Sequence, residues 1–169
     1  GSAFTLMLPA WETPEKADDS WVENVRARKG RILIVDDDVQ VLNVLSRLLV
    51  RNHEVETAEH GCEALAQFVP GYYDVALIDL GMSGMTGDVV AQAMRQKDPL
   101  LSVVLITGWM PEVGDSRLSV FDFTLLKPFE NMDDLELVIH KAIALHDDRM
   151  VRLNLQKPEQ TNKQTNNLS

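Results

Sequence analysis

Polar side chains that can act on phosphate follow several apolar runs of this chain, at the point where each run ends. They are Asp36, Asp37 and Asp38 after the first run, and Asp79, Thr107 and Lys127 after later runs. Carboxylates packed close together repel one another, so a site built from them needs a cation. Oxygen ligands favour Mg²⁺, which keeps several waters and shares its coordination shell with phosphate oxygens. The residue types therefore indicate a site for Mg²⁺ and a phosphoryl group.

The isolated carboxylate of Asp79 is the candidate nucleophile, because a carboxylate can accept a phosphoryl group and form an acyl phosphate. The cluster that begins at Asp36 is better placed to hold the metal, while Asp38 is expected to cap a helix. Lys127 would set a point charge against one phosphoryl oxygen, and Thr107 can donate a hydrogen bond to another. Phosphoryl transfer requires positioning and charge neutralisation, and this set of residues supplies both.

The elements that position these residues follow from the spacing of apolar side chains. Strands are expected at 32–35, 54–58, 75–78, 103–106 and 121–126. Helices are expected from apolar spacing within 41–49, 63–68, 89–94 and 135–143. A fourth helix, between Thr107 and Phe121, should be short or irregular, because Pro111 and Gly114 interrupt it.

The alternation of strands and helices predicts an α/β fold, with a doubly wound, five-stranded parallel sheet flanked by helices. Continuous apolar runs are typical of strands that are buried on both faces of such a sheet. Ligands bind outside the carboxyl ends of its strands. The fold therefore brings the polar residues at the strand ends to one edge.

Composition narrows the function further. The chain of 169 residues can form one domain with appendages, and its net charge of −10 argues against direct binding of nucleic acid. No apolar run approaches the ~18–20 residues that a membrane span needs, so no membrane contact by this segment is expected. Cys62 is the only cysteine, which excludes an internal disulfide and fits the cytoplasm.

The sequence resembles a response-regulator receiver domain of two-component signalling over about residues 30–146. The resemblance rests on Ile-Leu-Ile-Val-Asp-Asp-Asp at 32–38, Ala-Leu-Ile-Asp-Leu at 76–80 with Met82, Gly84, Met85 and Gly87, Leu-Ile-Thr-Gly at 105–108, and Leu-Lys-Pro-Phe at 126–129. It implies a receiver-like (βα)5 fold with strand order 2-1-3-4-5. It also implies a switch of the domain surface when Asp79 is phosphorylated.

The resemblance also implies roles for individual residues. Asp36 and Asp37 would be the acidic pair that binds Mg²⁺, with Asp79 as phosphoacceptor and the carbonyl of Gly81 as a backbone metal ligand. Thr107 and Lys127 would sense the phosphate. The implied donor is a histidine kinase or a phosphotransfer protein, and the output passes to a downstream protein. The domain itself would at most hydrolyse its own acyl phosphate slowly.

Two positions depart from the family pattern. Ser83 stands where the family usually has proline, and Thr124 stands where it usually has an aromatic residue. In the family that aromatic residue rotates as the residue equivalent to Thr107 moves toward the phosphate. We therefore expect the switch region of Thr107 and Thr124 to signal differently, unless a neighbour such as Phe123 takes the aromatic role.

The ends of the chain suggest a larger parent. Residues 1–10 resemble the last strand of a histidine-kinase ATP-binding domain, although a vector-derived Gly-Ser before an arbitrary apolar stretch is the alternative. Residues 11–29 are expected to be a linker, and 147–169 a polar, disordered tail. The parent chain would then be a hybrid sensor histidine kinase that can be membrane-associated.

Two other functions fit the same fold. An aspartate-nucleophile phosphatase of the haloacid-dehalogenase type would place Thr or Val where Gln40 stands, and it would need a cap domain for which this chain has no room. A phosphorylation-independent interaction domain typically has lost its acidic pair or its acceptor. This chain keeps all of these residues.

Overall fold

The computed structural model describes residues 28–109, 112, 114–129 and 131–156. The strand expected at 1–10 and nearly all of the linker expected at 11–29 lie outside these residues. The strands are β1 (Arg31–Val35), β2 (Glu54–Ala58), β3 (Val75–Asp79), β4 (Ser102–Thr107) and β5 (Phe123–Leu126). The helices are α2 (Val39–Leu49), α3 (Gly61–Gln67), α4 (Gly87–Lys97), the short 3-10 helix η1 (Ser116–Val120) and α5 (Met132–Leu155).

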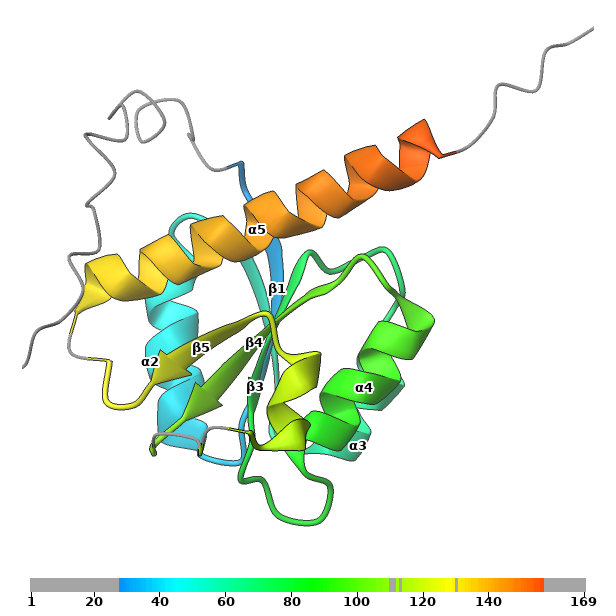
Figure 1. Cartoon of the computed structure of the whole chain (residues 1–169). Helices are drawn as coiled ribbons and strands as arrows, with labels where there is room; N and C mark the ends of the chain where they lie inside the picture. The colour runs from blue at the N-terminus through cyan, green and yellow to red at the C-terminus, as the bar shows by residue number, and fades with distance from the viewer. Residues whose placement is uncertain (1–27, 110–111, 113, 130, 157–169) are drawn as a thin grey trace, which may run out of the picture.

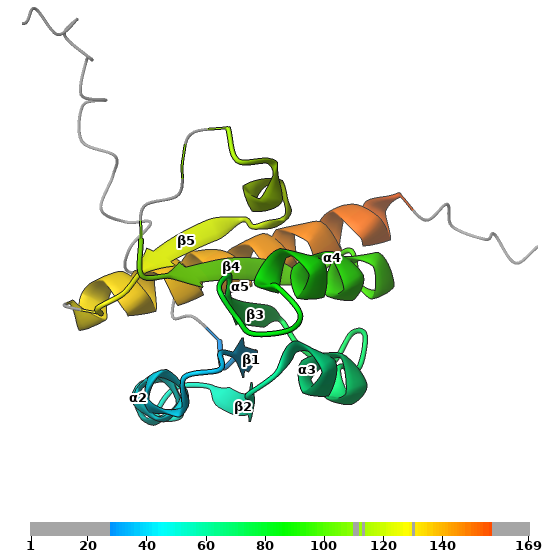
Figure 2. The ribbon, with the colours of Figure 1, turned by 90° about the horizontal axis from the view of Figure 1, so that it is seen from below.

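The five strands form one parallel sheet in the order β2-β1-β3-β4-β5. Helices α2 and α5 lie on one face of the sheet, and α3 and α4 lie on the other (Figures 1 and 2). The predicted fold class and strand order are therefore confirmed. No helix within the described part of the chain is both long enough and apolar enough to cross a membrane.

Two apolar clusters hold the layers together, one on each face of the sheet. Ile32 and Ile34 of β1 pack with Leu45 of α2 and with α5, whereas Leu33 of β1 packs with Met94 of α4 and with α3. Successive residues of a strand point to opposite faces, so a continuous apolar run supplies both clusters. Burial of each such side chain contributes about 1.5–3 kcal/mol.

The helix starts and the short fourth helix follow local sequence rules. The side chain of Asp38 accepts a hydrogen bond from the N–H of Gln40 at 2.8 Å, which confirms the predicted cap of α2. Between β4 and β5 the described residues form η1 alone, as the interruption by proline and glycine predicted. Gly114 adopts a φ of 95°, a conformation that glycine tolerates at little cost.

The tail predicted from residue 147 is wrong for residues 147–155, because α5 continues to Leu155. Figure 1 shows this end of α5 reaching past the sheet. Ion pairs hold the added turns instead of an apolar stripe. Arg149 donates to the carboxylate of Asp122 at 2.6 Å and to the carbonyl of Leu101 at 2.9 Å. Arg95 of α4 also pairs with Asp122, so this one carboxylate, on the residue before β5, joins α4 to α5.

The start of the described chain is tied to the same helix. Arg28, which falls in the expected linker, donates to both oxygens of Asp74 at 2.9 and 3.0 Å and pairs with Asp147 of α5. His146 is buried beside this group, with its Nδ1 3.5 Å from Asp74. The ordered domain therefore begins no later than residue 28.

Arg149→Ala should lower the free energy of unfolding by about 1–2 kcal/mol, because it removes three hydrogen bonds to the largely buried acceptors Leu101 and Asp122. Arg152→Ala is the matched control. Arg152 lies on the same helix but makes an exposed pair with Asp148, worth at most about 0.5 kcal/mol. Urea unfolding of both variants measures the difference. Equal losses of stability in the two variants would contradict the stabilising role of the Arg149 hydrogen bonds.

A second prediction concerns how the stability of the fold depends on pH. Burial alone would raise the pKa of Asp122, but hydrogen bonds from Arg149 and from the N–H of Val103 lower that pKa below its ordinary value. A lowered pKa in the folded state stabilises the fold above the unfolded-state pKa, about 3.9, and this contribution is lost as the pH falls through the folded-state value. Asp122→Asn should therefore cost most above about pH 5, and its cost should shrink below about pH 4.

Urea unfolding between pH 3 and pH 7 tests this, with Asp148→Asn as the control. Asp148 is half-exposed and pairs only with Arg152 among the described residues, so its replacement should have a small effect at every pH. A cost of Asp122→Asn that stays constant down to pH 3 would show that its charge is not what stabilises the fold.

Candidate functional site

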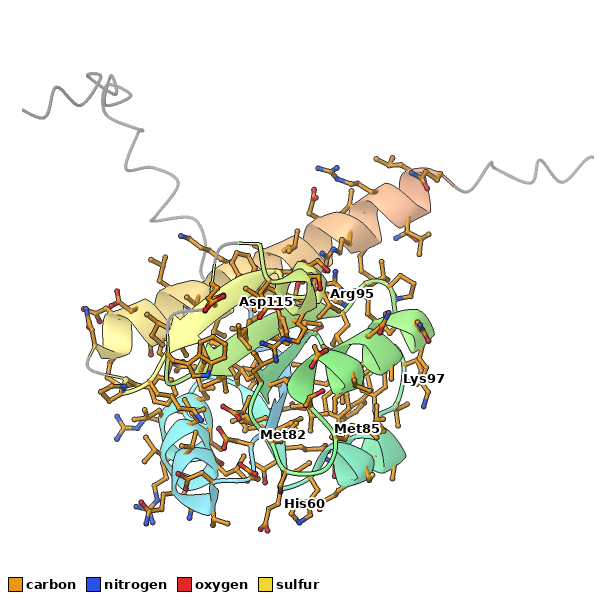
Figure 3. The ribbon with its side chains drawn as sticks, turned by 60° about the horizontal axis from the view of Figure 1, so that its bottom comes forward. His60, Met82, Met85, Arg95, Lys97 and Asp115 are labelled. Atoms are coloured by element: carbon orange, nitrogen blue, oxygen red, sulfur yellow. The ribbon has the colours of Figure 1, made fainter. Side chains whose placement is uncertain are left out.

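The strand-end residues predicted from sequence meet at one edge of the sheet. Asp36 follows β1, Asp79 ends β3, Thr107 ends β4 and Lys127 follows β5. Figure 3 turns this edge forward, with Met82 and Met85 marking the loop between β3 and α4. Because β1 and β3 are neighbours in the sheet, the carboxylates of Asp36 and Asp79 are forced close together.

Lys127 bridges these two carboxylates. Its Nζ lies 2.6 Å from Asp36 Oδ2 and 2.9 Å from Asp79 Oδ1. Burial alone would lower the pKa of Lys127, but its hydrogen bonds to both carboxylates raise that pKa above its ordinary value. Asp36 is fully buried, and this desolvation raises its pKa even though Lys127 and the N–H of Asp38 act in the opposite direction. The ammonium therefore compensates two crowded negative charges.

Backbone N–H groups hold the carboxylates in place. Asp36 Oδ1 accepts from the N–H of Asp38 at 2.8 Å, and Asp79 Oδ2 accepts from the N–H of Gly81 at 2.9 Å. Asp37 Oδ2 accepts from the N–H of Ser83, also at 2.9 Å. Each carboxylate thus has one oxygen fixed by the backbone.

The arrangement of oxygens suits a small divalent cation. One carboxylate oxygen from each of Asp36, Asp37 and Asp79 can be chosen so that all three lie within 4.8 Å of one another. Oxygens bound to the same Mg²⁺ lie at most about 4.2 Å apart, since each is about 2.1 Å from the ion. The donor set is all oxygen, which is the chemistry that Mg²⁺ prefers. These residues therefore fit the expected metal.

A close approach of α4 to the end of β3 completes the frame. A Cβ at Gly87, the first residue of α4, would lie 2.1 Å from the carbonyl oxygen of Asp79. Glycine at this position lets the helix start directly against the strand end. The sequence contained this glycine as part of the family pattern, but its physical reason appears only in the structure.

The expected switch residues, Thr107 and Thr124, lie on the neighbouring strands β4 and β5. The hydroxyl of Thr107, which is buried, donates to the carbonyl of Trp109 at 3.2 Å, and among the described residues it bonds to neither Asp79 nor Lys127. Thr124 is exposed on β5, opposite Leu105 of β4. Phe123 packs into the cluster of α2 and α5, on the face opposite to Thr124. Phe123 therefore does not fill the place of the expected aromatic residue.

Lys127→Met should lower the free energy of unfolding by about 2–3 kcal/mol at pH 7 without Mg²⁺, because two buried carboxylates lose their shared cation. Added Mg²⁺ should recover part of this loss. Lys97→Met is the control, because Lys97 lies exposed at the end of α4 (Figure 3) and should change stability by no more than about 0.5 kcal/mol. Thermal or urea unfolding measures all three effects. A larger loss for Lys97→Met would contradict this account.

Comparison with known proteins agrees with the geometry. The chain matches the family model of the response regulator receiver domain over residues 32–139. It is 29% identical to the DNA-binding transcriptional regulator NtrC of Escherichia coli over 133 residues, which cover 76% of this chain and 28% of NtrC. It is 28% identical to the aerobic respiration control sensor protein ArcB of Escherichia coli over 154 residues, which cover 88% of this chain and 20% of ArcB. The chain thus spans less than a third of either relative.

Solved structures of the same kind superpose on it. The response regulator protein TrrA of Thermotoga maritima, in complex with Mg(2+)-BeF, is 33% identical with a TM-score of 0.61, and the match covers 67% of this chain and 98% of TrrA. TrrA in complex with the histidine kinase ThkA superposes with a TM-score of 0.60 at 33% identity, covering 68% of this chain and 98% of TrrA.

Proposed function

Because the chain belongs to the response regulator receiver domain family, we propose that Asp79 is its phosphoacceptor and that a phosphohistidine of a partner protein is the donor. The observation that carries this proposal is the bridge of Lys127 between Asp36 and Asp79, at the edge where the third carboxylate also lies. A turn or helix-cap aspartate would not need such a partly buried cation beside it.

The proposed transfer uses the carboxylate of Asp79 as nucleophile. One of its oxygens attacks phosphorus, the new O–P bond forms an acyl phosphate, and the N–P bond breaks. The leaving imidazole nitrogen keeps the electron pair of that bond. Slow attack of water on the acyl phosphate would later restore Asp79.

Metal binding belongs to the same proposal. Asp36, Asp37, Asp79 and the backbone carbonyl of Gly81 would hold Mg²⁺, which supplies positive charge next to the carboxylates and the phosphoryl oxygens. The carboxylates have fixed positions before any cation binds, because backbone N–H groups already hold one oxygen of each. Preorganisation of this kind reduces the reorganisation that accompanies binding.

The chain's own donors would stabilise the product. The Nζ of Lys127 already touches Asp79 Oδ1, so it can hydrogen-bond a phosphoryl oxygen attached to that carboxylate. The hydroxyl of Thr107 would exchange the carbonyl of Trp109 for another phosphoryl oxygen. This exchange moves the end of β4, and we propose that the region of Thr107 and Thr124 carries the change to the surface.

A groove beside the site offers a surface for the phosphodonor. It is lined by apolar and polar side chains of α2 and of the loop after β5, namely Asp38, Gln40, Val41, Val44, Lys127, Pro128 and Phe129. Val44 is exposed on α2, so the groove leaves apolar area free for a partner. The structure of the similar protein TrrA with a histidine kinase supports a histidine kinase, or a phosphotransfer protein, as this partner.

The wider setting is also a proposal. The match to the sensor protein ArcB supports a parent chain that is a hybrid sensor histidine kinase. The segment would then act in the cytoplasm and pass its signal to another protein, without direct contact with nucleic acid.

Acetyl phosphate with Mg²⁺ should add the mass of one phosphoryl group to the protein, and Asp79→Asn should abolish this gain. Asp98→Asn is the matched control. Asp98 is also a buried aspartate that accepts backbone hydrogen bonds, but it caps the far end of α4. Intact mass spectrometry in neutral buffer measures the gain. Phosphorylation that persists in Asp79→Asn, or that does not occur in the unaltered chain, would overturn the proposed function.

A further inference from the structure

The three carboxylates of the site are not held in the same way. The donors to Asp36 and Asp79 are the N–H groups of Asp38 and Gly81, each two residues further along the chain. Such short-range bonds form wherever an aspartate ends a strand and begins a turn. The donor to Asp37 is the N–H of Ser83, which lies 46 residues away in the loop between β3 and α4.

Asp37 depends on this bond more than its neighbours depend on theirs. Asp36 and Asp79 are largely buried, and both also bind Lys127. Asp37 is exposed, and within the described residues the Ser83 N–H is the only donor to its carboxylate. Without that bond the side chain of Asp37 could adopt other rotamers that point into solvent.

The loop that carries Ser83 is itself fixed. Met82 is 4% exposed and lies in the apolar cluster beneath α3 and α4, and Met85 packs against the same cluster (Figure 3). The N–H of Gly87 also donates to the carbonyl of Leu80, which closes the base of the loop. The Ser83 N–H is therefore held in position on both sides.

We propose that the backbone N–H of Ser83 is a positioning group for Asp37, which holds one carboxylate oxygen so that the other faces the cation. The proposal rests on the proposed function, because it concerns the same Mg²⁺ site. It explains what the serine contributes where the family pattern usually has proline: proline has no N–H and could not make this bond. The hydroxyl of Ser83 has no part in the proposal.

Two substitutions separate the N–H from the side chain. Ser83→Ala keeps the N–H and removes only the hydroxyl, whereas Ser83→Pro removes the N–H. In titration calorimetry of the full chain with MgCl₂, Ser83→Ala should bind with the affinity of the unaltered protein. Ser83→Pro should bind about three- to tenfold more weakly, the range expected for loss of one hydrogen bond to an exposed charged group.

A second readout needs no metal and no proline variant. In the metal-free protein the amide proton of Ser83 should exchange slowly with solvent, and Asp37→Ala should make it exchange at least several-fold faster. The N–H of Gly81, which bonds to Asp79, should keep its exchange rate and serves as the internal control. Amide exchange measured by NMR gives both rates.

The outcomes distinguish this inference from the proposed function. If the unaltered protein does not bind Mg²⁺, the proposed metal site itself is wrong. If the unaltered protein binds Mg²⁺ and Ser83→Pro binds it equally well or better, the positioning role of Ser83 is overturned while the site stands. An amide exchange rate at Ser83 that does not respond to Asp37→Ala overturns the role as well, including in the case where Ser83→Pro does not fold.

Discussion

The repulsion among three carboxylates at one edge of the sheet is the constraint on which the rest of this structure depends. Neighbouring parallel strands lie about 4.8 Å apart, so Asp36, which follows β1, and Asp79, which ends β3, must lie close together. Lys127 meets this constraint by bridging Asp36 and Asp79. The same lysine would be free to turn to a phosphoryl group once a cation shares the charge. In the proposed function, the cost of crowding is thus what would make the site respond to both Mg²⁺ and a phosphoryl group.

The order of the strands sets the distance that Lys127 must span to reach Asp79. Lys127 follows β5, which is separated from β3 by β4, a distance of about 10 Å between strand axes. The loop after β5 and the long side chain of Lys127 cross that distance. Gly87 allows α4 to begin directly against the end of β3, which keeps the loop from Gly81 to Met85 short and close to Asp37. The positions of the charges are therefore consequences of packing at the ends of buried strands.

Most of this could be predicted from sequence, because buried strands and amphipathic helices leave periodic apolar patterns. The same patterns placed Asp36, Asp79, Thr107 and Lys127 at strand ends, and the rule that parallel strands share an edge brought them together. The contact of Ser83 could not be predicted this way. Its donor is a backbone N–H, which every residue except proline carries, so residue type gave no signal beyond the absence of proline.

The full length of α5 also could not be predicted from the pattern of apolar residues. Its last turns lack an apolar stripe, so they read as a polar tail, yet Arg149 and Asp147 hold them through partners that are distant in sequence. Those contacts join the two ends of the described domain. Helix α5 starts beside the loop that carries Lys127 and Phe129. It runs for 24 residues, about 36 Å, and ends beyond the ion pair between Asp147 and Arg28. A displacement of the whole helix at the loop after β5 would therefore also have to break or shift the ion pairs that Asp122 and Arg28 make with it.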